Sequence, residues 1–149
     1  MLRLNNRRKN ERGATLVEFS IGVTVFLTAM FGVLEFGRAL WVHNALTDAA
    51  RRGARYATLH TQGDIDSVKN VVVYGNPAGT GQPMVNDLTT TQVDVNYNNF
   101  GLNDGTVAVS INSYQFQFVI PIIGTTITMP HYTTTLPAES AGLIPPNIP

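Results

Sequence analysis

The clearest hydrophobic pattern in the sequence is a long apolar run near its start. From residue 14 to residue 34 the only charged side chain is that of Glu18. This run approaches the ~20 residues that an α-helix needs to cross the hydrocarbon core of a bilayer. We therefore expect a transmembrane helix over residues 14–37, with Trp41 just beyond it as an interfacial aromatic residue.

Beyond the apolar run, small and apolar residues recur every three or four positions, which is the spacing of one helix face. This small-residue stripe consists of Ala39, Val42, Leu46, Ala49, Gly53 and Ala57. No proline interrupts residues 14–60, and Gly63 with Asp64 supplies a stop signal. The pattern predicts one helix from residue 14 to about Leu59. Its outer half, residues 38–60, is expected to be an amphipathic extension that packs on the rest of the chain.

After Gly63 the sequence changes to residues that favour strands and turns, chiefly Thr, Val, Asn, Gly and Tyr. We expect strands at residues 68–74, 92–97, 106–112 and 125–135. A loop rich in Gly and Pro, residues 75–83, separates the first two strands. Residues 61–135 are therefore predicted to form a β-rich head, and residues 136–149 a Pro-rich tail.

Turn and parity signals predict how the strands connect. Asn103-Asp104-Gly105 is a turn signal between two alternating stretches and indicates a hairpin. Large apolar residues occupy odd positions from Val107 to Ile111 and even positions from Tyr114 to Phe118. We therefore expect a bulge or a strand break at Asn112 and Ser113, where this alternation shifts by one residue. Pro130 marks the last strand as an edge or a bent segment. The predicted fold class is α+β, with a long N-terminal transmembrane and amphipathic helix packed on a small antiparallel β-sheet head.

Charge divides the chain at the apolar run. Residues 1–13 carry five basic side chains against the single acid Glu11. By the positive-inside rule this segment lies in the cytoplasm and the head lies across the membrane. A secretory signal peptide is the alternative. The run is long for a signal peptide, however, and residues 35–41 offer no small-x-small cleavage site, so a retained anchor is favoured.

Glu18 is the unusual residue of the apolar run, because acids inside a membrane are costly and normally have a partner. One interpretation is that Glu18 lies shallow enough to reach the lipid headgroups. The other is that it pairs with a cation from a neighbouring subunit or with a new amino terminus created nearby. Helical spacing also predicts three ion pairs, which are Glu35–Arg38, Asp48–Arg51 and Asp48–Arg52.

The sequence offers no recognisable site for catalysis. It contains no cysteine, which excludes disulfides, thiolate zinc sites and cysteine nucleophiles. The three histidines are far apart, and Asp64 with Asp66 fits a capping role better than a calcium site. Beyond Arg55 the only Lys or Arg is Lys69, so we expect no nucleic-acid binding. The expectation is a protein that is not an enzyme and has no cofactor or metal.

Three motifs stand at definite distances from one another within the first 60 residues. They are Arg12-Gly13-Ala14-Thr15-Leu16-Val17-Glu18-Phe19, Leu34-Glu35-Phe36-Gly37-Arg38 and Asn44-Ala45-Leu46-Thr47-Asp48-Ala49-Ala50-Arg51-Arg52-Gly53-Ala54-Arg55-Tyr56-Ala57. In this combination they resemble the TadE-like minor pseudopilins of the tight adherence (Tad, or Flp) pilus systems. The head carries no motif diagnostic of that family.

The resemblance implies a type IV pilin-like fold and processing by a prepilin peptidase between Gly13 and Ala14. Residues 1–13 would then be a leader peptide, and Glu18 would be the fifth residue of the mature chain. In pilin-like assemblies this acid is thought to meet the free N-terminal amine of an adjacent subunit. Phe19 stands where the major pilins of these systems carry tyrosine, which favours the minor class.

The resemblance also implies the partners and the location of the protein. The partners would be the prepilin peptidase, other pilin and pseudopilin subunits, the inner-membrane pilus assembly machinery and the lipid bilayer. The location would be the bacterial cytoplasmic membrane, crossed once, with the head outside the cytoplasm. The alternative is a plain single-pass membrane protein whose β-rich head binds a ligand or an envelope partner, with Gly13 and Glu18 incidental.

Overall fold

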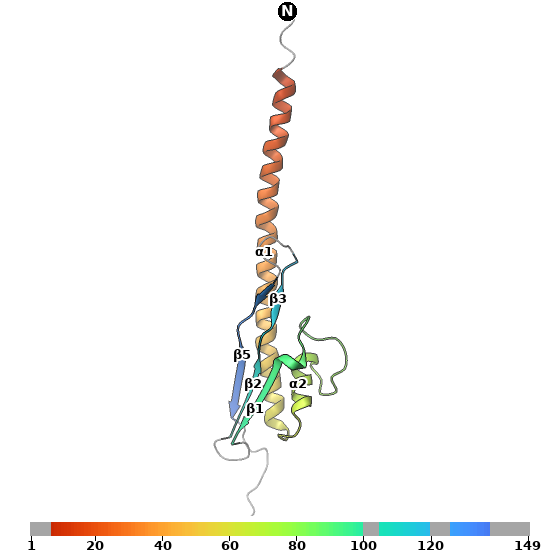
Figure 1. The fold of residues 1–149 in the computed structure, drawn as a ribbon, viewed down its shortest axis with the longest axis vertical. Helices are drawn as coiled ribbons and strands as arrows, with labels where there is room; N and C mark the ends of the chain where they lie inside the picture. Colours follow the sequence, from red (N-terminus) through yellow and green to blue (C-terminus); the bar gives the residue numbers. More distant parts are fainter. Residues whose placement is uncertain (1–6, 100–104, 120–125, 138–149) are drawn as a thin grey trace, which may run out of the picture. The chain divides into compact units, whose positions relative to one another are not determined.

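The computed structural model describes residues 7–99, 105–119 and 126–137 (Figure 1). Its elements, in chain order, are α1 (Arg7–Leu59), α2 (Ile65–Tyr74), a 3-10 turn η1 (Thr90–Gln92), β1 (Val93–Asn98), β2 (Thr106–Ile111), β3 (Gln115–Gln117), β4 (Thr126–Thr128) and β5 (Tyr132–Pro137). The predicted α+β class, with a long apolar N-terminal helix packed on a small antiparallel sheet, is confirmed. The chain divides into two compact units, Met1–Arg38 and Ala39–Pro149.

The first unit contains the N-terminal part of α1. The helix begins at Arg7, earlier than residue 14, because Arg, Lys and Glu residues ahead of the apolar run are themselves good helix formers. It is long and apolar enough to cross a membrane, with an 18-residue window of mean hydropathy 1.9 and no buried residue in that window. The predicted C-terminal end at Leu59 is confirmed.

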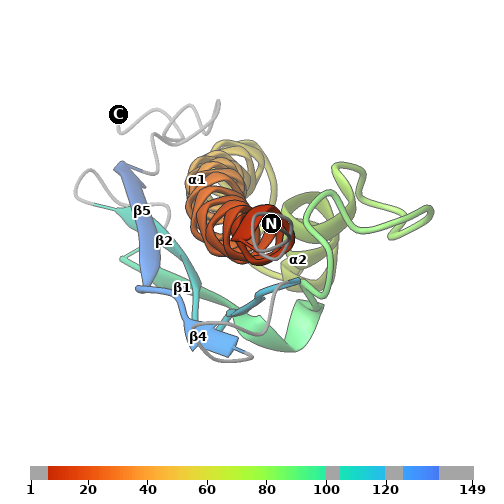
Figure 2. The same ribbon diagram turned by 90° about the horizontal axis from the view of Figure 1, so that it is seen from above.

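The second unit is the head, built around the small-residue stripe of α1. Val42, Leu46, Ala49 and Ala57 are buried, as the periodicity predicts, and Ala50 and Ala54 widen the buried face. Figure 2 shows this part of α1 with strands on one side and α2 on another. The small side chains allow both neighbours to approach the helix closely, which is why the stripe contains no large residue except Leu46.

The main sheet of the head has three antiparallel strands in the order β1-β2-β5. In its register Val95 faces Val109, and Val109 faces Thr134. Alternate residues of β2 point into the core, and these are Val107, Val109 and Ile111. The predicted antiparallel pairing of the two middle strands is therefore confirmed. The predicted turn at Asn103-Asp104-Gly105 lies partly outside the described residues.

The sheet ends where the sequence pattern changes parity. After Ile111 the chain leaves β2, and Ser113 adopts a left-handed φ of 56°. Tyr114 and Phe116 then take over the inward positions and are both buried. The break expected at residues 112–113 is confirmed, and beyond it β3 pairs with β4 in a separate two-stranded sheet.

The prediction of a strand at residues 68–74 was wrong, because this segment forms α2. Its run of valines fits a strand by propensity, but Val68, Val71 and Val72 also lie three and four residues apart and share one helix face. All three are buried in the head. Gly75 ends the helix in a left-handed conformation with φ 76°, and its N–H donates to the carbonyl of Val71.

The last predicted strand, residues 125–135, is divided into two. β4 ends at Thr128 and β5 begins at Tyr132, and the chain between them contains Pro130, which cannot donate a ladder hydrogen bond. β5 extends to Pro137, so it includes two residues that were assigned to the Pro-rich tail. It lies at an edge of the main sheet, which agrees with the edge character expected from Pro130.

Candidate functional site

The first predicted motif lies on the exposed surface of α1. Gly13 and Ala14 are inside the helix and exposed, and a Cβ added at Gly13 would meet nothing within 4 Å. Glu18 and Phe19 are exposed as well, with Phe19 at 68%. No described side chain pairs with Glu18. The segment therefore presents a glycine, an acid and an aromatic ring to the surroundings of the helix.

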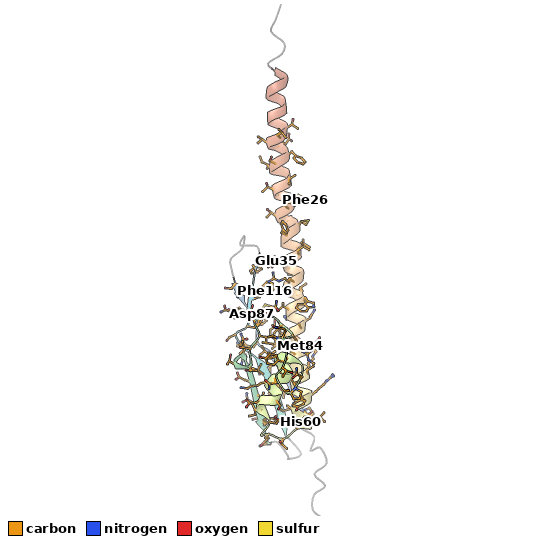
Figure 3. All side chains as sticks on the ribbon, turned by 90° about the vertical axis from the view of Figure 1, so that its right-hand side faces the viewer. Phe26, Glu35, His60, Met84, Asp87 and Phe116 are labelled. Atoms are coloured by element: carbon orange, nitrogen blue, oxygen red, sulfur yellow. The ribbon has the colours of Figure 1, made fainter. Side chains whose placement is uncertain are left out.

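The apolar part of α1 surrounds this motif with exposed hydrophobic side chains. Phe26, for example, is 66% exposed and projects from the helix (Figure 3). The large exposed residues on this stretch are Leu16, Val17, Phe19, Ile21, Val25, Phe26, Leu27, Met30, Phe31, Val33, Leu34 and Phe36. A surface this apolar and contiguous marks an interaction with a membrane or with other proteins.

Three hydroxyl groups within the apolar stretch are satisfied by the helix itself. Ser20 donates to the carbonyl of Leu16 at 2.7 Å, Thr24 to that of Ser20 at 2.8 Å, and Thr28 to that of Thr24 at 2.8 Å. A hydroxyl bonded in this way does not need water, so it is tolerated in hydrocarbon. The spacing of four residues was a readable signal that sequence reasoning missed.

The second motif, at residues 34–38, contains the predicted ion pair. Nη1 of Arg38 donates to both carboxylate oxygens of Glu35, at 3.0 and 2.8 Å. The Glu35 side chain is only 11% exposed, so this pair is better shielded than a surface salt bridge. Phe36 is exposed, and Gly37 has open space where a side chain would lie. The pair between Glu35 and Arg38 is confirmed.

The third motif divides between the core and the surface of the head. Gly53 and Ala54 are buried, while Arg51 and Arg55 are exposed. The ring of Tyr56 stacks on His60 with centroids 3.7 Å apart. The glycine and alanine thus serve packing, and the arginines are available to a partner.

The predicted ion pairs of Asp48 are only partly correct. Nη1 of Arg51 lies 3.7 Å from Oδ1 of Asp48, and both side chains are largely exposed, which makes the pair weak. Arg52 turns elsewhere, and its Nη2 donates to the thioether sulfur of Met84 at 3.1 Å. The reason is that the loop after α2 brings Met84 over this face of the helix, a contact that spacing within the helix does not reveal.

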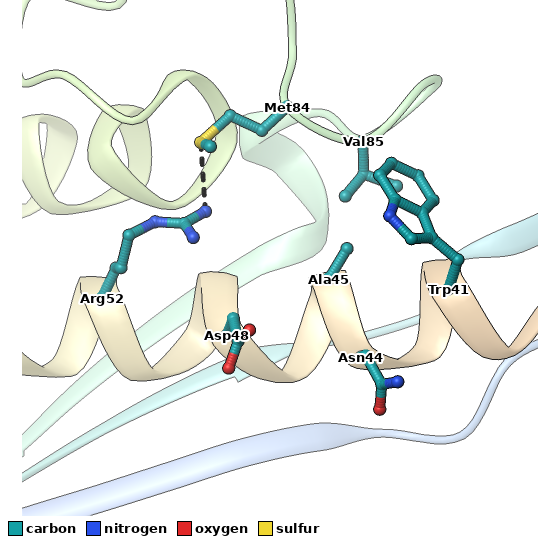
Figure 4. Close-up of a pocket in the computed structure, with 7 residues that line it drawn as sticks. All are labelled: Trp41, Asn44, Ala45, Asp48, Arg52, Met84 and Val85. Carbon is teal, nitrogen blue, oxygen red and sulfur yellow. Dashed lines mark hydrogen bonds between the residues drawn. The ribbon is translucent and has the colours of Figure 1, made fainter.

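A groove of about 240 Å³ lies beside Arg52 in the head (Figure 4). It is lined by Trp41, Asn44, Ala45, Asp48, Arg52, Met84 and Val85. Nε of Arg52 is buried and has no hydrogen-bond partner among the described residues. Trp41 was expected only as an interfacial residue, and nothing in the sequence pattern indicates that it meets Val85.

Two tyrosines of the head have perturbed ionisation. Burial raises the pKa of Tyr132, whose hydroxyl lies 2.9 Å from Nδ1 of His43. Burial and, to a smaller extent, the carboxylate of Asp64 raise the pKa of Tyr97. Both shifts follow from packing against the core and suggest no catalytic role. Within residues 7–99, 105–119 and 126–137 no group of three or more His, Cys, Asp or Glu is placed to hold a metal ion.

Taken together, the described residues form a long apolar helix, of a length that could cross a membrane, and a small α+β head. Residues 13–55 match the family model described as TadE-like protein. The resemblance seen in the three motifs is thereby confirmed, and the match indicates a protein related to Tad pili. No curated protein and no solved structure matches the chain.

Proposed function

We propose that the protein is a minor pseudopilin that takes part in the assembly or initiation of a tight-adherence pilus and carries out no catalysis itself. The observation that carries this proposal is the family match, which begins at Gly13 and ends at Arg55 and so covers the second motif and most of the first and third. The exposed apolar surface of α1 supports it, because subunits of this kind need a helix that suits both lipid and neighbouring helices.

In this proposal a prepilin peptidase cuts between Gly13 and Ala14 and releases residues 1–13 as a leader. The bond lies inside α1, so the peptidase must first unwind this turn. A glycine in a helix costs about 1 kcal/mol relative to alanine and thereby makes unwinding easier at this position. Gly13 has no neighbour within 4 Å that a cut would have to displace.

Cleavage would give Glu18 its partner. The new amino group of Ala14 carries a positive charge, and the amine of an adjacent subunit would pair with the carboxylate of Glu18. Glu18 has no described partner within its own chain, which leaves the acid available for such a contact. A charge pair in lipid adds little net stability, so its main effect would be to fix the register between subunits.

The proposed topology places the basic residues before Gly13 in the cytoplasm and the head, residues 61–135, outside it. Residues 14–37 would span the bacterial cytoplasmic membrane once, and residues 38–60 would continue the helix into the head, whose core they help to form. The hydroxyls of Ser20, Thr24 and Thr28 support this assignment, since each is already bonded within the helix. The partners would be the peptidase, other pilin subunits and the membrane assembly machinery.

The test is mass spectrometry of the membrane-extracted protein from cells with and without their prepilin peptidase. We expect a mature chain that begins at Ala14 only when the peptidase is present. Gly13→Ala serves as the matched control, because alanine keeps the helix but should block cleavage. A chain with the same uncut N-terminus in both strains would reject the pseudopilin assignment and favour a plain membrane protein with a partner-binding head.

The role of the acid is tested in the same cells with Glu18→Ala and Glu18→Gln. Both variants should be cleaved at Gly13, because the cut bond is not altered, and both should lose piliation. Normal pili in the Glu18→Gln strain would show that the charge is not needed for assembly.

A further inference from the structure

The two-stranded sheet β3–β4 exposes apolar side chains that the head does not cover. Val119, two residues after the end of β3, is 75% exposed, and Ile127 in the middle of β4 is 51% exposed. A two-stranded sheet is marginally stable by itself, and covering its apolar side chains would stabilise it. We name Phe118, Val119 and Ile127 the apolar edge.

The two faces of this sheet differ in chemistry. Its polar face carries exposed side chains only, which are Gln115, Gln117, Thr126 and Thr128. On the opposite face Phe116 lies directly across from Ile127. Phe116 is fully buried and meets the ring of Phe118 edge-on at 5.2 Å. Ile127 therefore belongs to the core-facing side of the sheet but extends beyond the core.

The apolar edge lies at the end of the head where α1 enters it. Val109 of β2 is close to the position of Gly53, whereas Tyr132, which pairs with the end of β2, contacts His43. β2 thus runs toward the N-terminal side of this helix segment, and β3 continues in that direction for about 3.3 Å per residue. Figure 1 shows β3 at this end of the head.

The composition of this region suits a lipid surface. No residue from position 114 to position 130 is charged. Trp41, the single tryptophan of the sequence, is 60% exposed. It lies in the first turn of the α1 segment that belongs to the head, which begins at Ala39. Aromatic and aliphatic side chains without charges favour the membrane interface, where glutamine and threonine can still meet water. By chain continuity this end is the one that follows the membrane-length part of α1.

We propose that the apolar edge docks on the bilayer surface and gives the head a second contact with the membrane besides α1. Removing these apolar side chains from water would favour docking. The contact would restrict the orientation of the head before the subunit leaves the membrane. This inference depends on the proposed membrane anchorage by α1.

The experiment uses the absence of cysteine, which makes a single introduced cysteine unique. The full chain carries an environment-sensitive fluorophore at Val119→Cys or Ile127→Cys and is reconstituted into phosphatidylcholine vesicles that contain nitroxide-labelled lipid. Thr135→Cys, exposed on β5, is the matched control for the head, and Leu27→Cys is the positive control for the apolar helix. At positions 119 and 127 we expect the nitroxide lipid to quench the fluorescence and the emission maximum to shift to the blue. At position 135 we expect neither effect.

The outcomes separate this inference from the proposed function. If position 27 is quenched but positions 119 and 127 behave like 135, the docking proposal is overturned and the anchor stands. If position 27 is not quenched either, both proposals fail. If positions 119 and 127 shift to the blue without nitroxide quenching, and only as the protein-to-lipid ratio rises, the edge contacts another copy of the chain and the lipid proposal is overturned.

Discussion

At the scale of single residues, Gly53 allows α1 to approach its two neighbours closely. A Cβ built at this position would collide with Cγ2 of Val72 and lie 3.2 Å from Cγ1 of Val109. Both valines are fully buried, and their branched side chains have little rotamer freedom with which to give way. Because Gly53 has no side chain, α2 and β2 can both pack closely against α1 at this position.

Gly53→Ala should destabilise the head. Overpacking a core costs about 1–3 kcal/mol, and the better helix propensity of alanine returns about 1 kcal/mol, so a net loss of up to about 2 kcal/mol is expected. Denaturant unfolding of the detergent-solubilised protein, followed by Trp41 fluorescence, measures it. Gly63→Ala, which meets nothing within 4 Å, is the control and should change stability little. Equal stability of the two variants would show that Val72 and Val109 leave room for a methyl group at Gly53.

The ionisation of Tyr132 predicts a loss of stability at high pH. Burial raises the pKa of this tyrosine above its ordinary value of 10.0, so the folded state favours the neutral phenol. The contribution of this pKa shift to the free energy of unfolding is fully present below pH 10.0, and it is lost as the pH rises through the higher pKa of the folded state. Absorbance titration of the folded protein should show a late-titrating component from Tyr132 and Tyr97, which Tyr132→Phe reduces to that of Tyr97. Persistence of the full late component in that variant would assign it to Tyr97 instead.

At the scale of elements, α2 shows how packing selects a helix where the sequence also fits a strand. Its valines lie on one face and are buried, and the αL residue Gly75 ends it. β-branched residues favour strands only modestly, within about 1 kcal/mol, so burial of several side chains on a helical face outweighs the preference.

Substitutions at Ser67 distinguish a helix from a strand in this segment. Ser67 is half-buried in the first turn of α2, away from the fully buried valine face. In a helix Ser67→Ala should stabilise and Ser67→Gly destabilise, with a difference of about 1 kcal/mol between the two variants. Thermal unfolding of both proteins measures this difference. If the two variants unfold together, or if Ser67→Val is more stable than Ser67→Ala, the segment behaves as a strand.

At the scale of the whole molecule, the core lies in only one of the two units. Every buried residue of the hydrophobic cluster comes from the chain between Val42 and Tyr132, and none comes from the part of Met1–Arg38 whose side chains are described. The N-terminal part of α1 thus presents its apolar surface to its surroundings, and the C-terminal part supplies one wall of the core. The N-terminal part of α1 therefore depends on contacts outside the chain, whereas its C-terminal part is stabilised by packing within the head.

A chain that starts at Ala39 should fold, because it retains the whole core cluster. We expect dispersed amide signals in its proton–nitrogen NMR spectrum and a loss of less than about 1 kcal/mol relative to the full chain, since no buried apolar contact is removed. A chain that starts at Thr61 lacks the small-residue stripe and should be unfolded. Failure of the first chain to fold would show that the head depends on the apolar part of α1.

The sequence alone determined the features that depend on local interactions. The apolar run, the helix to Leu59, the parity change after Ile111 and the pair between Glu35 and Arg38 all follow from spacing within a few residues. The motifs around Gly13 and Glu18 were likewise readable without a structure. Hydropathy, periodicity and i,i+3 spacing act within one element, so a single sequence is sufficient to predict them.

Only the tertiary structure decided which of several local possibilities was realised. Residues 68–74 became a helix because the head buries its valine face, and Arg52 turned to Met84 because a loop 32 positions away lies over it. The groove beside Trp41 and the uncovered apolar edge at Ile127 likewise depend on chain segments that are distant in sequence. Contacts between segments that are distant in sequence decide which of these conformations is most stable. The spacing of residues within one element does not predict such contacts.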